Sequence, residues 1–190
     1  MLKTGNRVGI SMMNTIRINY EGMRAYLQQA VIKTNELLRT REFYDQIAAH
    51  PGFDMADINP MAISELMSRA NINMAVDLYY SISPFRNIDG YDDAENPALI
   101  HINIWTIQRP VASLCNTLVH SCVHAVNALN DRYYFGHGDI TLDGKENTAP
   151  YQIGSIAQDM ISKGETRYIP LEHDMFRTGV KYLKDFPAFN

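Results

Sequence analysis

The chain has 190 residues, of which 46% are hydrophobic and 20% are charged, with a formal net charge of -4 at pH 7. This composition is typical of an ordinary globular protein, and the length is sufficient for one sizeable core. No linker divides the sequence, so we expect residues 1–190 to form a single domain. The charge and the scattered Lys and Arg argue against a nucleic-acid partner, and no apolar run approaches the ~20 residues that span a membrane.

Hydrophobic periodicity divides the chain into helices and strands. Asn59-Pro60 has the pattern of a helix start, and Pro51-Gly52 that of a helix end. We interpret the chain as an α+β domain in which a small, mostly antiparallel sheet packs with several helices. The predicted elements are a strand over 15–20, helices over 21–47 and 59–70, strands over 73–81 and 98–105, and helices over 109–129, 148–161 and 171–183.

The two cysteines, Cys115 and Cys122, are seven residues apart in one helical pattern. Two helical turns separate their Cα atoms by about 10 Å, which is too far for a disulfide. We therefore expect two small buried side chains in a reducing compartment. The N-terminus has no clear signal-peptide cleavage site, so the cytoplasm is the expected location, although export by a dedicated secretion system would leave no trace in the sequence.

The helix over 109–129 carries two histidines, His120 and His124, four residues apart. A helix turns once per ~3.6 residues, so both side chains lie on one face, roughly 6 Å apart, and can reach one metal ion. They belong to a narrow polar stripe beside a wide apolar face, as expected of a half-buried helix that lines a cleft. The alternative is a histidine pair that only hydrogen-bonds to neighbouring backbone.

A third histidine, His137, follows in the sequence Gly136-His137-Gly138-Asp139, thirteen residues after His124. Catalytic zinc sites use three protein ligands and one water, and the ligands are imidazoles or carboxylates. We expect zinc as the metal and His137 as the third ligand, with Asp139 as the second choice. The flanking glycines allow the tight backbone path that would direct this imidazole inward. The alternative is an ordinary polar turn that contains a histidine.

From about residue 98 to 160 the sequence resembles the zincin metallopeptidases. In that family a strand bordering the substrate cleft precedes a helix with the motif His-Glu-x-x-His, and the corresponding residues here are His120-Ser121-Cys122-Val123-His124. The resemblance implies a zincin-like domain with His120 and His124 as metal ligands. Ser121 replaces the glutamate that acts as general base in the family, so the base is unassigned, with Glu146 and Asp139 as candidates.

These residues support two functions. The first is a zinc-dependent hydrolase of peptide or other amide bonds, in which His120, His124 and His137 hold zinc and the ion activates water. The second is a non-catalytic binding protein, in which the metal is structural or the cleft holds a peptide or partner protein without cutting it. The missing glutamate favours the second function. A third alternative is an effector toxin that acts on a cell wall.

Overall fold

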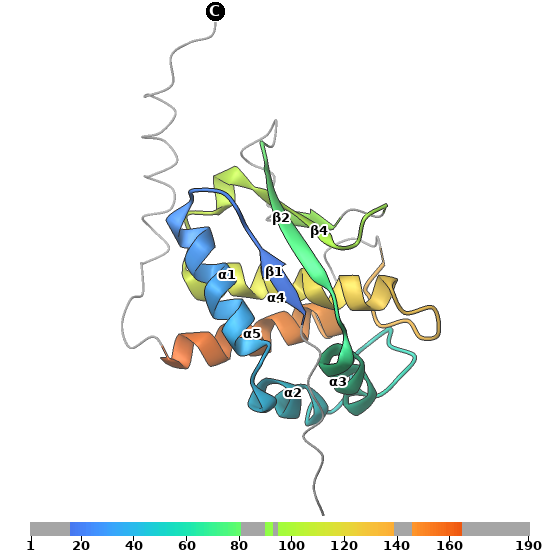
Figure 1. The fold of residues 1–190 in the computed structure, drawn as a ribbon. Coiled ribbons are helices and arrows are strands. Elements are labelled where there is room, and N and C mark those ends of the chain that lie inside the picture. Colours follow the sequence, from blue (N-terminus) through green and yellow to red (C-terminus); the bar gives the residue numbers. More distant parts are fainter. Residues whose placement is uncertain (1–15, 81–89, 93–94, 139–145, 165–190) are drawn as a thin grey trace, which may run out of the picture.

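The computed structural model describes residues 16–80, 90–92, 95–138 and 146–164 (Figure 1). The predicted strands over 15–20, 73–81 and 98–105 are confirmed as β1, β2 and β4. The predicted helix over 171–183 lies outside the described residues. The elements are β1 (Arg17–Asn19), α1 (Ala25–Leu37), α2 (Arg41–Ala48), α3 (Pro60–Arg69), β2 (Asn73–Tyr79), β3 (Gly90–Asp92), β4 (Leu99–Asn103), the 3-10 helix η1 (Ile104–Thr106), α4 (Val111–Ala128) and α5 (Ala149–Gly164).

The helix predicted over 21–47 is two helices, α1 and α2, because the chain turns at residues 38–40. Leu38 is the C-terminal cap of α1 and is fully buried. The hydroxyl of Thr40 donates a hydrogen bond to the carbonyl oxygen of Leu37 at 2.7 Å, and this bond satisfies one of the carbonyls at the helix end. The apolar periodicity continues across this turn, which is why it suggested one longer helix.

The sheet is mostly parallel, so the prediction of a mostly antiparallel sheet was wrong. The strand order is β1-β2-β4-β3, in which β1 and β4 both run parallel to β2, and the short β3 pairs antiparallel with β4 at the edge. The reason is the path of the chain between β2 and β4. The chain returns through β3, so β4 runs in the same direction as β2 and lies between β2 and β3. The α+β class is retained.

The outer edge of β1 is covered by α1. The side-chain amide of Asn35 on α1 accepts a hydrogen bond from the backbone N–H of Ile18 at 2.9 Å and donates one to its carbonyl oxygen at 2.8 Å. The amide therefore pairs with the edge of the sheet as a further strand would, and it satisfies backbone groups that an open edge leaves free.

Helix α4 lies against α1 and α5 on one side of the sheet, and ten of its eighteen residues are buried (Figure 1). Cys115 and Cys122 of α4 are both fully buried and form no disulfide, which confirms the expectation that they are core residues. None of the described helices combines the length and the apolar character that a membrane span requires.

Tyr44 on α2 gives the core a measurable dependence on alkaline pH. Its hydroxyl donates a hydrogen bond to the carbonyl oxygen of Leu38 at 2.8 Å, and the residue is only 5% exposed. Burial, and to a smaller degree the neighbouring Cys122, raises the pKa of this hydroxyl above its ordinary value. A raised pKa means that the fold favours the neutral form, so this contribution to stability is complete below about pH 10 and is lost above it.

We therefore expect Tyr44→Phe to lower the free energy of unfolding by about 1 kcal/mol at neutral pH, the usual contribution of one hydrogen bond. The variant should also lose less stability than the wild type as the pH rises past about 10. Urea denaturation of both proteins across this range measures the difference. Identical pH dependence in the two proteins would contradict the role given to Tyr44.

Candidate metal centre

The structure brings the three predicted histidines together. The Nε2 atom of His124 lies 3.1 Å from that of His120 and 2.9 Å from that of His137, and the remaining side of the triangle, between His120 and His137, is 3.2 Å. All three side chains are half-buried. Because their nitrogen atoms converge within one coordination sphere, the three histidines lie close enough to hold one metal ion.

The dimensions of this triangle fit a zinc ion. Zinc–nitrogen bonds of about 2.0–2.1 Å at tetrahedral angles separate the ligand nitrogens by roughly 3.3–3.4 Å, slightly more than the observed sides. Hydrogen bonds cannot account for all three Nε2–Nε2 contacts. Each neutral Nε2 is either a donor or an acceptor, so at least two of the three atoms are of the same kind and cannot hydrogen-bond to each other. A single cation at the centre satisfies all three lone pairs at once.

The hydrogen bonding of His137 is also suited to a metal ligand. Its Nδ1 atom lies 2.8 Å from the carbonyl oxygen of Gly138. A carbonyl oxygen only accepts hydrogen bonds, so Nδ1 carries the proton and the lone pair of the neutral ring is on Nε2, the atom that faces the other two histidines. Metal-binding histidines commonly have such a carbonyl partner, because it fixes both the tautomer and the ring orientation.

Two of the three histidines are placed by one helix, as predicted. His120 and His124 project from α4 with ring centroids 4.9 Å apart. His137 comes from the segment after α4, where Gly138 has φ of 64°. This left-handed conformation favours glycine, so Gly138 has the backbone role predicted for both flanking glycines, whereas Gly136 does not have a positive φ.

Tyr151 on α5 packs against the histidines. Its ring centroid lies 4.7 Å from that of His120 in an edge-on arrangement and 5.2 Å from that of His137. Helix α5 approaches α4 closely at Gly154, where a Cβ atom would collide with the side chain of Asn116 and lie 3.1 Å from its carbonyl oxygen. The small residue at position 154 therefore allows α5 to bring the tyrosine ring to the site.

The segment that carries His137 is held by contacts that sequence reasoning did not assign. The buried ring of Phe135 anchors it in the core, and the backbone N–H of Phe135 donates to Oδ1 of Asn127 at 2.7 Å. The backbone N–H of Tyr134 donates to Oδ2 of Asp57 at 2.9 Å. The sequence contained a signal for Asn127, because this residue follows His124 by three positions on the same polar stripe of α4. Asp57 had no comparable signal, because it lies outside any periodic element.

Of the two predicted bases, only Glu146 lies in the part of the chain that the structure describes, and it does not join the histidines. Glu146 is exposed, and its carboxylate does not belong to the group of ligand atoms that converge within 4.8 Å. Asp139 lies outside the described residues. Ser121, at the position of the glutamate in the zincin motif, is only 4% exposed. The roles of Glu146 and Asp139 therefore stay predictions.

In comparisons with known proteins, no protein-family model, no curated protein and no solved structure matches this chain. The resemblance to the zincins therefore depends on the motif around His120 and His124 and on the strand that precedes its helix.

Proposed function

We propose that the protein is a zinc-dependent hydrolase of peptide or other amide bonds. The observation that carries this proposal is the convergence of three imidazole nitrogens within 3.2 Å of one another on a half-buried surface. Imidazole is a preferred ligand of zinc, and a set of three protein ligands leaves the fourth tetrahedral position for water or substrate. Bound zinc supplies Lewis acidity, which lowers the pKa of water and polarises a carbonyl group.

The chain's own residues contribute position and surroundings. His120 and His124 are on a helix that is buried on most of its surface, so their separation is held by the core. His137 keeps the required tautomer through the carbonyl oxygen of Gly138. The ring of Tyr151 packs against the rings of His120 and His137. Such support by neighbouring groups is what a precise metal site requires.

The second candidate is a binding protein that holds the metal without catalysis. Two observations favour it. Ser121 is buried at the position of the glutamate in the zincin motif, and no carboxylate of the described residues joins the three nitrogens. In this case the zinc stabilises the fold or a peptide-binding surface, and substrate turnover is absent.

A peptide- and amide-hydrolysis assay of the zinc-loaded protein tests the proposal. We expect turnover that a chelator abolishes, and we expect His124→Ala to lower it by more than about 100-fold, since even outer partners of metal ligands contribute 10–100-fold. The control is His50→Ala, because His50 does not belong to the three-histidine group. Glu146→Gln and Asp139→Asn then separate the candidate bases, because only the variant that lacks the base loses turnover. One bound zinc per chain without any hydrolysis would instead support the binding protein.

A further inference from the structure

Residues 53–58, between α2 and α3, are attached to the start of α5. The backbone N–H of Asp54 donates to the carbonyl oxygen of Asn147 at 2.9 Å, and the Asn147 side chain donates to Oδ1 of Asp54 at 3.0 Å. Asp54 also forms a parallel β-bridge with Thr148. Met55, the next residue, has φ of 59°, which is unfavourable for a non-glycine residue. The backbone conformation of the 53–58 segment is therefore maintained by its contacts with other residues and not by the intrinsic backbone preference of its own residues.

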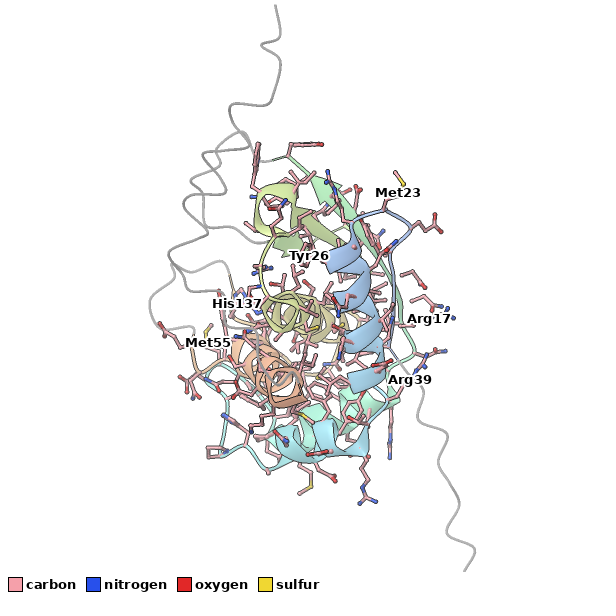
Figure 2. The ribbon with its side chains drawn as sticks, turned by 90° about the vertical axis from the view of Figure 1, so that its left-hand side faces the viewer. Arg17, Met23, Tyr26, Arg39, Met55 and His137 are labelled. Atoms are coloured by element: carbon pink, nitrogen blue, oxygen red, sulfur yellow. The ribbon has the colours of Figure 1, made fainter. Side chains whose placement is uncertain are left out.

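The same segment holds the chain that leads to the third histidine. Asp57 binds both backbone groups of Tyr134: its own N–H donates to the carbonyl oxygen of Tyr134 at 2.8 Å, and its Oδ2 accepts from the N–H of Tyr134 at 2.9 Å. Figure 2 shows Met55, from the 53–58 segment, and His137 on the same side of the molecule. Tyr134 precedes His137 by only three residues, so the position of one restricts the other.

Little freedom remains between Tyr134 and His137. The ring of Phe135 is fully buried, and its N–H is bound to Asn127. A Cβ atom on Gly136 would lie 3.1–3.2 Å from atoms of the Tyr134 ring, so this ring packs directly over the backbone before His137. Because Asp57 binds both the N–H and the carbonyl oxygen of Tyr134, the path of the chain from Tyr134 to the imidazole is restricted.

We propose that Asp57 is a positioning residue for the metal centre: its carboxylate holds residues 134–137 so that the His137 imidazole meets the two histidines of α4. This inference rests on the proposed metal site. A ligand that is already in place loses less conformational freedom when the ion binds, so affinity is higher. By reciprocity, the bound ion also stabilises the docking of residues 134–137 on the 53–58 segment.

Zinc affinity, measured by competition with a chelator, tests this role. We expect Asp57→Ala to bind zinc about 10–100-fold more weakly than the wild type, the range found for groups that support metal ligands. Asp57→Asn should retain most of the affinity, because its amide oxygen still accepts from the N–H of Tyr134. The matched control is Asp131→Ala. This substitution removes the same charge from an exposed site between the end of α4 and Tyr134, and it should leave the zinc affinity unchanged.

Amide hydrogen exchange over residues 130–137 provides a second readout. Exchange should be faster in metal-free Asp57→Ala than in the metal-free wild type, and saturating zinc should restore protection. A purely structural role would lower the unfolding temperature but leave the zinc affinity of the folded protein unchanged, and that result would overturn the inference. If Asp57→Ala does not fold, Asp57→Glu, which displaces the carboxylate by one methylene, should show the same weakening. A wild type that binds no zinc would refute the metal site itself, whereas equal affinity of wild type and variants would refute only the role of Asp57.

Discussion

Each of the substitutions His120→Ala, His124→Ala and His137→Ala is expected to abolish stoichiometric zinc binding. The three Nε2 atoms surround one position, so each variant removes one protein ligand from the same ion. Zinc sites with four protein ligands bind with ~10–16 kcal/mol, or about 3 kcal/mol per ligand, which corresponds to more than about 100-fold in affinity. Elemental analysis of protein purified without added metal, together with zinc titration of the stripped protein, measures the loss.

The control for this experiment is His50→Ala. His50 stacks on Phe53 with ring centroids 4.3 Å apart and lies outside the three-histidine group, so its loss should leave the zinc content unchanged. In the wild type, zinc at about 1,000 times its dissociation constant should raise the free energy of unfolding by ~4 kcal/mol, and a chelator should reverse the gain. The shared site would be refuted if only one of the three substitutions affected zinc binding.

Phe135→Ala is expected to weaken both the fold and the metal centre. The ring is fully buried, and removal of a buried phenylalanine side chain typically lowers the free energy of unfolding by ~3–5 kcal/mol. Phe135 also precedes His137 by two residues, so loss of its anchor should let the imidazole move away from the other two. Urea denaturation measures the first effect, and zinc titration under native conditions measures the second.

Phe43→Ala is the matched control, because Phe43 on α2 is equally buried but does not lie in the segment that carries His137. Both variants should lose stability to a similar extent, and only Phe135→Ala should also lose zinc affinity. Phe135→Leu, which keeps most of the buried volume, serves if the alanine variant does not fold. Equal zinc affinity in the Phe43 and Phe135 variants would show that the anchor does not position the ligand.

Local periodicity was sufficient to predict two of the three histidines of the candidate metal centre. His120 and His124 are four residues apart on a helix, and the geometry of a helix brings such a pair together whatever the rest of the fold does. The burial of Cys115 and Cys122 followed from the same helical pattern. For His137 the sequence indicated a suitable residue type between glycines, but the distance to α4 depended on contacts from elsewhere in the chain.

Those contacts join residues that are remote in sequence, so no local sequence pattern predicted them. The hydrogen bond between Asp57 and Tyr134 spans 77 positions. The directions of the strands could not be predicted from the sequence for a related reason. Alternation of apolar and polar residues identifies β2 and β4 as strands, but it is the same in parallel and antiparallel pairs, and only the return of the chain through β3 made this pair parallel.

By itself, then, the amino-acid sequence determined the helix that carries two histidines, the strands β1, β2 and β4, and the buried cysteines, because these depend on periods of two to four residues along one element. The tertiary structure alone decided the direction of the strands, the break between α1 and α2, and the meeting of His137 with the other two imidazoles. These depend on packing and hydrogen bonds between distant segments, whose relative positions are set only when the whole core is formed.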